Sequence, residues 1–348
     1  MIGSMARADL DSSVAIIGAG PIGIELAVAL QRAGIDAIQF DARQIGYTIS
    51  WFAPQTKFFS SNERIAIAGV PLQTADQNKA TREEYLAYLR GVVQQFGLRI
   101  NTYEPLVGID RVDSAFVLTT RLASGDRTYR VGKLILATGG TDHPRRLNIP
   151  GEDLPHVSAY FNDPHTYFGK RLLVIGGKNS AVEAALRCHS AGASVAISYR
   201  RDRLPDKSIK YWLLPEINGL IGAGRIDAYF QSTPTQIYPD RVTLRRGNES
   251  FDVPADFVLS LIGFEQDNTL FKIAGLKIAG DCGAPIFDEA TMQTSVPGIF
   301  VAGTAVAGTQ DKYRVFIENC HVHVDRIVNA LVGASPPPVP APLAQPES

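Results

Sequence analysis

Residues 14–41 read VAIIGAGPIGIELAVALQRAGIDAIQFD, and this stretch decides the fold of the chain. An apolar segment typical of a buried strand leads through a glycine-rich turn at residues 18–23 into a segment of helical periodicity. A second strand pattern follows and ends at Asp41. This order predicts a βαβ unit of about 30 residues.

The glycine spacing in this unit is that of a dinucleotide-binding turn. Gly18 allows the tight turn, Gly20 leaves no Cβ in the path of a pyrophosphate, and Gly23 lets helix and strand pack closely. The pyrophosphate would meet the unpaired N–H groups and the positive end of the helix dipole. Asp41 stands where it can accept hydrogen bonds from a ribose. An ordinary glycine turn is the alternative, and the agreement of strand, spacing and terminal acid disfavours it.

A second segment repeats this plan with different chemistry. Residues 172–175 read as a strand, residues 176–181 are GGKNSA, and a helix to about residue 191 is followed by a strand that ends in Arg200 and Arg201. The two guanidinium groups stand where the first unit has Asp41, and they suit a 2′-phosphate, which favours NADPH. A solvated basic surface is the alternative explanation. One acidic and one basic ribose site together indicate FAD in the first unit and NADPH in the second, with hydride passing from nicotinamide to flavin.

Composition excludes several classes of protein. The 348 residues include 34 basic and 35 acidic side chains, a formal charge of −1 that excludes broad electrostatic binding to nucleic acid or an anionic membrane. No stretch reaches the ~18 consecutive apolar residues of a membrane helix, and the amino-terminal residues lack an apolar signal segment, so we expect a soluble protein that is not secreted. The proline-rich residues 334–348 are predicted to be a disordered tail.

The three cysteines, Cys188, Cys282 and Cys320, are far apart and odd in number. They support neither a disulfide framework nor a cysteine zinc site, and they fit a reducing, cytoplasmic setting. We interpret each as a structural residue. The run 320–323, CHVH, is not expected to bind metal, because residues i and i+2 do not share a helix face.

The remaining segments alternate between strand and helix patterns, which predicts doubly wound α/β sheets. The expected elements are a loop region at 45–77, a helix at about 82–96, β-rich segments at 106–121 and 129–137, strands at 241–244 and 257–262, and a final helix from about Lys312 to Val332.

The order of motifs resembles the low-molecular-weight thioredoxin reductase group over nearly all of residues 12–332. The matching motifs are GAGPIG (18–23), ILATGG (135–140), NIPGE (148–152), VIGGKNSAVEAAL (174–186), SYRR (198–201) and QTSVPGIFVAG (293–303). The resemblance implies two Rossmann-like, doubly wound, three-layer dinucleotide-binding domains of the thioredoxin reductase type. These are a discontinuous FAD domain at 10–153 plus 264–333 and an NADPH domain at 154–263, with FAD domains paired in a homodimer.

Two departures from that group carry chemical meaning. The Cys-x-x-Cys pair expected shortly before the second glycine motif is absent, because residues 157–164 read VSAYFNDP, and this excludes thioredoxin reduction through a dithiol. Thr304 replaces the aspartate that usually holds the flavin ribityl chain, so Thr304 or the adjacent backbone has to supply that contact.

Local matches narrow the resemblance to the bacillithiol disulfide reductase family, whose FAD- and NADPH-dependent members also lack Cys-x-x-Cys. The matches are FFSS (58–61), GGKNSA (176–181), SIKYWLLP (208–215) and FIEN (316–319). That family often has cysteine where this chain has Ile22, which leaves the substrate open.

The predicted site residues follow from the motifs and the resemblance. Those expected to bind FAD are Gly18, Gly20, Pro21, Ile22, Gly23, Asp41, Thr138, Gly139, Gly303 and Thr304. Those expected to bind NADPH are Gly176, Gly177, Lys178, Asn179, Ser180, Arg200 and Arg201. For catalysis the candidates are Lys312 and Arg314, at the start of the expected final helix, and Tyr160, which with Trp51, Phe52 and Phe161 would line the flavin.

Three functions remain open from the sequence. The leading one is an NADPH oxidoreductase that passes electrons from flavin to a small-molecule disulfide or a small redox carrier protein. The second is a ferredoxin or flavodoxin NADP reductase, which the near-neutral charge and the lack of aromatic residues after Val332 disfavour. The third is a redox sensor that binds the nucleotides without turnover.

Overall fold

The computed structural model describes residues 10–310 and 314–334. These residues form two compact units, each with many internal contacts. The first unit contains the described residues up to Ser50, Ser60–His143 and those from Glu265 onward, and the second contains Trp51–Phe59 and Pro144–Phe264. The sequence placed the domain boundaries at 153/154 and 263/264 and kept residues 51–59 in the first domain. The crossing segments β7 (His143–Pro144) and β16 (Phe264–Glu265) pair as a two-stranded sheet.

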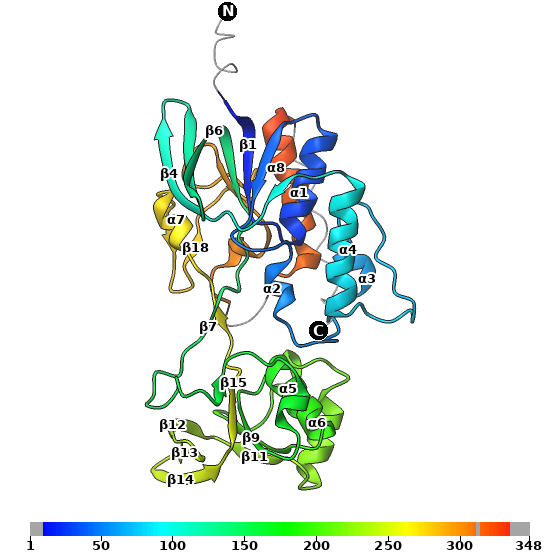
Figure 1. The fold of residues 1–348 in the computed structure, drawn as a ribbon, viewed down its shortest axis with the longest axis vertical. Coiled ribbons are helices and arrows are strands. Elements are labelled where there is room, and N and C mark those ends of the chain that lie inside the picture. Colours follow the sequence, from blue (N-terminus) through cyan, green and yellow to red (C-terminus); the bar gives the residue numbers. More distant parts are fainter. Residues whose placement is uncertain (1–9, 311–313, 335–348) are drawn as a thin grey trace, which may run out of the picture. The chain divides into compact units, whose positions relative to one another are not determined.

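The first unit is built on a sheet with the order β3-β2-β1-β6-β5-β4, and β19 also pairs with β6. Figure 1 labels strands β1, β4 and β6 of this sheet. Its strands are β1 (Ser12–Ile17), β2 (Ala37–Phe40), β3 (Ile100–Asn101), β4 (Leu106–Val112), β5 (Ala115–Leu122), β6 (Gly125–Leu136) and β19 (Ile299–Val301). Strand β6 has two roles along its length. Its first half is antiparallel to β5, and its last residues run parallel to β1 and β19.

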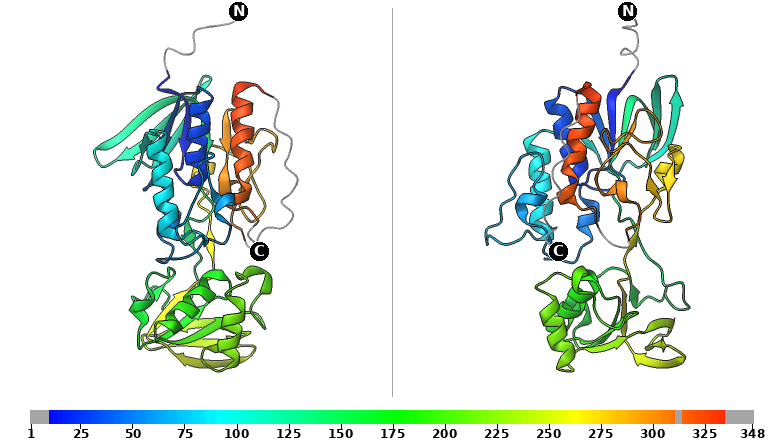
Figure 2. Two further views of the ribbon diagram at one scale, coloured as in Figure 1. Left: turned by 90° about the vertical axis from the view of Figure 1, so that its right-hand side faces the viewer. Right: turned by 180° about the vertical axis from the view of Figure 1, so that it is seen from behind.

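Helices α1 and α8 lie side by side in this unit, as both views of Figure 2 show. The helices are α1 (Pro21–Arg32), α2 (Tyr47–Ser50), α3 (Asn62–Ile65), α4 (Arg82–Gln95), α7 (Thr269–Ile273) and α8 (His321–Val332). Short elements complete it: the strands β17 (Ile278–Ala279) and β18 (Ala284–Pro285) and the 3₁₀ turns η3 (Gly303–Ala307) and η4 (Ile317–Asn319). Helix α1 buries Ile24, Leu26 and Leu30 completely, as an amphipathic helix packed on a core does.

The prediction of a final helix that begins near Lys312 is wrong. Helix α8 begins at His321, and Lys312 itself lies outside the described residues. Side chains compete with the helix in the preceding segment: Gln310 Oε1 accepts hydrogen bonds from the backbone of residues 314 and 315, and Asn319 bonds the backbone of residues 314 and 316. Cys320 is therefore the residue before α8, not a residue two turns into it.

The second unit has a parallel sheet with the order β11-β10-β9-β15-β8 and a separate antiparallel sheet, β12-β13-β14. Its elements are β8 (Val157–Ser158), η1 (Pro164–Tyr167), β9 (Arg171–Ile175), α5 (Asn179–Ser190), β10 (Ser194–Tyr199), η2 (Asp206–Ser208), α6 (Leu214–Gly222), β11 (Asp227–Phe230), β12 (Thr233–Ile237), β13 (Arg241–Arg246), β14 (Glu249–Pro254) and β15 (Phe257–Ser260). Strands β9, β10 and β15 carry apolar runs because the sheet is buried. Both units thus have the α/β character that the sequence predicts.

Candidate functional site

The first glycine turn has the geometry of a phosphate-binding turn. Gly18 has φ +111°, and a Cβ there would lie 2.3 Å from Ala137 O. A Cβ at Gly23 would lie 2.1 Å from Gly18 O, so helix and strand approach as the spacing predicts. A Cβ at Gly20 would meet no protein atom within 4 Å, which leaves open space in front of the turn. Helix α1 begins at Pro21 with no side-chain cap among the described residues, so its first N–H groups remain available to an anion.

Asp41 stands at the end of β2, beside this turn. Its Oδ2 accepts the Ala19 N–H at 2.7 Å, and its Oδ1 accepts the Arg43 N–H at 2.7 Å. Burial raises the pKa of this carboxyl, although both backbone bonds act in the opposite direction. Each carboxylate oxygen can accept a further bond, so Asp41 fits the predicted ribose contact.

Parallel strands β1, β2, β6 and β19 bring their carboxyl ends to one edge of the sheet, where a doubly wound fold binds its ligand. Thr138 and Gly139 follow β6, and Gly303 and Thr304 follow β19. Gly139 has φ +89° and open space at its Cβ position. Gly303 has φ +69°, and a Cβ there would lie 3.4 Å from the Ile22 Cβ. All the predicted FAD residues therefore gather around this edge.

Two buried oxygens at this edge have no hydrogen-bond partner among the described residues: Thr138 Oγ1 and Gln266 Oε1. The Gln266 amide nitrogen donates to Gly139 O at 2.9 Å and to Ala305 O at 3.0 Å, which fixes the orientation of the side chain. Orphaned polar atoms of this kind require an explanation, and a polar cofactor supplies one. The edge therefore fits FAD, with Gln266 and Thr304 on the side where the usual aspartate is missing.

His323 was not predicted as a site residue, yet its Nδ1 accepts the Gly303 N–H at 3.2 Å. Burial lowers the pKa of His323 to about 4, and the charges of Arg326 and His321 act in the same direction. The imidazole is therefore neutral near pH 7 and holds the turn after β19. No local pattern marks His323 or Gln266 in the sequence, because both act on residues far away in the chain.

The second glycine turn also depends on close packing. Gly176 has φ +138°, and a Cβ there would lie 2.4 Å from Leu261 O. A Cβ at Gly177 would lie 2.5 Å from the Tyr199 ring. Lys178 precedes α5 in extended conformation, and no side chain caps that helix within the described residues. Asn179 and Ser180 form the first turn of α5, so the predicted NADPH residues of this motif lie together.

Arg200 and Arg201 follow β10, and both side chains are exposed. Strand β10 occupies in this sheet the place of β2 in the first, next to the strand that enters the glycine turn. The two arginines are therefore available for a 2′-phosphate at the ribose end of the second site.

Of the three candidates for catalysis, the structure describes Arg314, in the first unit, and Tyr160, in the second. Lys312 lies outside the described residues, and Arg314 is exposed in a segment without helix. Tyr160 belongs to an aromatic cluster of the second unit, where the Trp51 ring lies 5.2 Å from Tyr160 and 4.8 Å from Phe264. Phe161 is buried in that unit's core instead. No catalytic residue is assigned.

The three cysteines of the chain do not form a dithiol. All three are free; Cys188 and Cys320 are buried and Cys282 is exposed. Burial raises the pKa of the Cys188 thiol to about 12, and it also raises the pKa of Cys320. Within residues 10–310 and 314–334, no group of His, Cys, Asp and Glu side chains is arranged to bind a metal ion.

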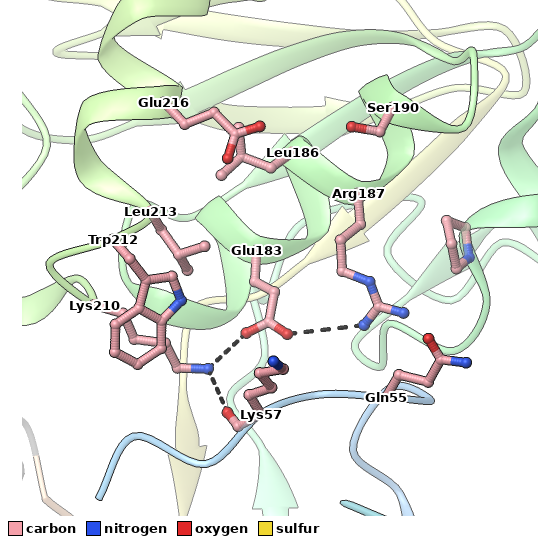
Figure 3. Close-up of a pocket in the computed structure, with 11 residues that line it drawn as sticks. Gln55, Lys57, Glu183, Leu186, Arg187, Ser190, Lys210, Trp212, Leu213 and Glu216 are labelled. Atoms are coloured by element: carbon pink, nitrogen blue, oxygen red, sulfur yellow. Dashed lines mark hydrogen bonds and ion pairs between the residues drawn. The ribbon is translucent and has the colours of Figure 1, made fainter. Parts of the chain in front are cut away.

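A cavity of about 360 Å³ opens in the second unit beside α5 and α6 (Figure 3). Its walls carry the basic residues Lys57, Arg187 and Lys210 together with Glu183 and Glu216. Arg187 and Lys210 are both engaged with carbonyl groups and with Glu183, so these charges stabilise the protein itself.

Comparison with known proteins agrees with this geometry. The model of the pyridine nucleotide-disulphide oxidoreductase family matches residues 15–303. The chain belongs to this family. Bacilliredoxin reductase Bdr of Bacillus subtilis (strain 168) is 36% identical over 310 residues, which are 88% of this chain and 94% of that protein. The structure of bacillithiol disulfide reductase Bdr from Bacillus cereus matches with a TM-score of 0.88 and 34% identity, covering 92% of this chain and 99% of the other.

A ferredoxin–NADP reductase of Ignicoccus hospitalis (strain KIN4/I) is 30% identical over 302 residues, 83% of this chain and 88% of that protein. Membership in the pyridine nucleotide-disulphide oxidoreductase family confirms the prediction of an FAD- and NADPH-dependent oxidoreductase with two dinucleotide-binding domains of the thioredoxin reductase type. Among the described residues, no helix has the length and apolar character needed to cross a membrane.

Proposed function

We propose that this pyridine nucleotide-disulphide oxidoreductase reduces a small-molecule disulfide with electrons from NADPH, without a dithiol of its own. The observation that carries the proposal is the similarity to Bdr over nearly the whole chain, combined with three cysteines that include no pair. The net reaction takes one hydride from NADPH and one proton from solvent and converts one disulfide into two thiols. The family's FAD supplies the two-electron relay between nicotinamide and acceptor.

In this proposal the chain's residues bind and orient the cofactors. The amino end of α1 and Asp41 hold the FAD diphosphate and its ribose, and Thr138, Gly139, Gly303 and Thr304 surround the remainder. The amino end of α5 holds the NADPH diphosphate, and Arg200 and Arg201 select the 2′-phosphate.

Ile22 is the residue that bears most directly on the substrate. It is 6% exposed and lies against Gly303, at the position where bacillithiol disulfide reductases often have cysteine. A thiol is therefore missing at this place too, and the acceptor has to react at the flavin itself.

The test is anaerobic reduction of the purified protein followed by different acceptors. We expect NADPH to bleach the visible flavin absorbance and bacillithiol disulfide to restore it, with Cys188→Ala, Cys282→Ala and Cys320→Ala each retaining at least half of the wild-type kcat. A colourless protein contradicts every flavoenzyme function. Reoxidation by ferredoxin, or by a small redox carrier protein, and by no disulfide supports the second candidate, which the Ignicoccus relative favours. Bleaching without transfer to any acceptor favours a sensor.

Ile22→Cys is the matched variant for this proposal. We expect it to leave flavin reduction by NADPH within about twofold of wild type, because the side chain lies on the FAD unit and not at the NADPH turn. A gain in disulfide turnover of tenfold or more would show that the wild-type acceptor is a different molecule.

The oligomeric state and compartment belong to the same proposal. The resemblance to thioredoxin reductases supports a homodimer, which light scattering on the purified protein tests. Three unpaired cysteines and the use of NADPH support a reducing, cytoplasmic setting.

A further inference from the structure

Parts of three motifs that are far apart in the sequence meet in the second unit: residues 58–59 of the first motif, 176–181 and 208–215. Asn179 Oδ1, in the nucleotide turn, accepts the Lys210 backbone N–H at 2.6 Å. The Phe59 ring stacks on the Trp212 ring with centroids 6.0 Å apart and an interplanar angle of 18°. Cofactor binding at residues 176–181 does not explain why the motifs at 58–61 and 208–215 accompany that turn.

Lys210 connects these segments through its side chain as well. Its Nζ donates to Glu183 Oε2 at 2.8 Å and to Lys57 O at 2.9 Å (Figure 3). The side chain is only 8% exposed. A buried ammonium is stable only when it is paired, so these two bonds fix its position.

A second cation attaches the same segment to α5. Arg187 donates to Pro54 O at 2.6 Å and lies 3.8 Å from Glu183 Oε1. Glu183 therefore lies between the two cations. Arg187, on α5, binds the carbonyl of Pro54, and Lys210, just before α6, binds the carbonyl of Lys57. Residues 51–59 are held to the second unit by these contacts.

The segment carries an aromatic side chain into that unit. The Trp51 ring packs against Tyr160 and Phe264, whose own centroids are 6.1 Å apart. Phe264 is the residue at which the chain leaves the second unit. Residues 51–59 thus contact both α5 and this aromatic cluster.

We propose that Lys210 is a positioning residue that couples nucleotide binding at the second glycine turn to the placement of residues 51–59. The coupling rests on the proposed NADPH site. A nucleotide that orders the amino end of α5 orders Asn179, and through it the backbone and ammonium of Lys210. Nucleotide binding then offsets part of the conformational entropy that is lost when residues 51–59 become ordered. Linkage requires the reverse effect, so an ordered segment raises the affinity for the nucleotide.

The experiment is hydrogen–deuterium exchange of the full-length holoprotein with and without NADP⁺. In wild type, NADP⁺ should slow amide exchange at residues 176–180 and also at 51–59. In Lys210→Met the slowing at 176–180 should remain, the slowing at 51–59 should disappear, and the dissociation constant for NADP⁺ should rise roughly threefold to tenfold. A purely structural role of Lys210 would change exchange equally with and without NADP⁺.

Glu183→Gln provides a second variant that keeps the side-chain volume and removes the charge, and it should show the same loss to a smaller extent. Lys210→Arg should restore part of the coupling. Arg241→Met, which breaks an exposed ion pair with Asp252 in the same unit, is the matched control and should leave both effects intact.

Slowing at 176–180 without slowing at 51–59 in wild type overturns the coupling and leaves the NADPH site in place. If NADP⁺ still slows exchange at residues 51–59 in Lys210→Met and Glu183→Gln, the coupling is also overturned. No change at residues 176–180 would instead show that the proposed nucleotide site is wrong.

Discussion

The two glycine turns share a backbone design and differ in what stands beside them. In each, the first glycine has a positive φ and no room for a Cβ, and the following helix begins without a side-chain cap in the described structure. Beside the first turn, Asp41 is partly buried and bonded to two backbone N–H groups, whereas Arg200 and Arg201 beside the second are exposed. In the proposed function, the backbone binds a diphosphate in both cases, and the group after the second strand decides which ribose fits.

Helix α4 has an amino-terminal capping box, which α1 and α5 lack in the described structure. Thr81 Oγ1 accepts the Glu84 N–H at 3.3 Å, and Glu84 Oε2 accepts the Thr81 N–H at 2.8 Å. This capping box satisfies the helix end internally. The amino ends of α1 and α5 have no such side-chain cap in the described structure, and in the proposed function a diphosphate takes its place.

The largest effect should separate the tasks of two glycines in the first turn. Gly18→Ala should lower the free energy of unfolding of the apoprotein by roughly 3 kcal/mol, because of its positive φ and the contact with Ala137 O. Gly20→Ala should change it by less than about 0.5 kcal/mol and still lose the flavin. Denaturant unfolding and the visible absorbance after gel filtration measure the two effects. Retention of flavin in Gly20→Ala would contradict the proposed diphosphate position.

The support of the first site by His323 predicts a pH dependence that the second site does not share. The folded-state pKa of about 4 lies below the ordinary value of 6.5, so the unfolded chain binds the proton first. Wild type should therefore lose about 3 kcal/mol of stability between pH 6.5 and pH 4 relative to His323→Asn, which keeps an acceptor for Gly303. His321, whose pKa is raised because its bonds with Glu25 and Arg64 outweigh burial, contributes its pH dependence above pH 6.5. Parallel stability curves of the two proteins would refute this assignment.

The exposed arginines of the second site should give a smaller effect. Arg200→Ala and Arg201→Ala should each raise the KM for NADPH roughly fivefold to tenfold and leave the KM for NADH unchanged, because a charge-assisted bond to the 2′-phosphate is lost in a solvent-exposed place. The difference should shrink as salt is added. Arg241→Ala is a control on the same unit. Equal losses for both nucleotides would mean that the arginines form only a basic surface.

The capped helix should show the smallest effect. Thr81→Ala should lower the free energy of unfolding by about 1 kcal/mol, because the Glu84 N–H loses its partner. Flavin content and the KM for NADPH should not change. A loss of flavin in this variant would show that α4 contributes to the cofactor site.

Local rules explain what could be predicted from the sequence. Both glycine turns, the strands that lead into them and the residues that end the next strands follow from short-range spacing. The start of α8 could not be predicted, because Gln310 and Asn319 bond the backbone of a stretch that otherwise continues the helical pattern. Helix α6 was missed because its sequence, LPEINGLIG, contains one proline, one asparagine and two glycines, all of which are weak helix formers.

The missed site residues share a different cause. Gln266 and His323 act on Gly139 and Gly303, which are 127 and 20 residues away in the chain. The attachment of residues 51–59 to the second unit depends in the same way on Arg187 and Lys210. Such contacts arise from tertiary packing, and no periodicity records them.

The excursion of Trp51–Phe59 limits how this protein can be recombined. A fragment of residues 144–264 would keep every motif of the second nucleotide site and still lose the carbonyls that Arg187 and Lys210 bind. Arg187 and Lys210 would then keep Glu183 and lose the carbonyl groups that they bind. A chimera that exchanges the NADPH unit with a relative therefore has to exchange residues 51–59 as well. The exchangeable unit consists of two separate segments of the chain.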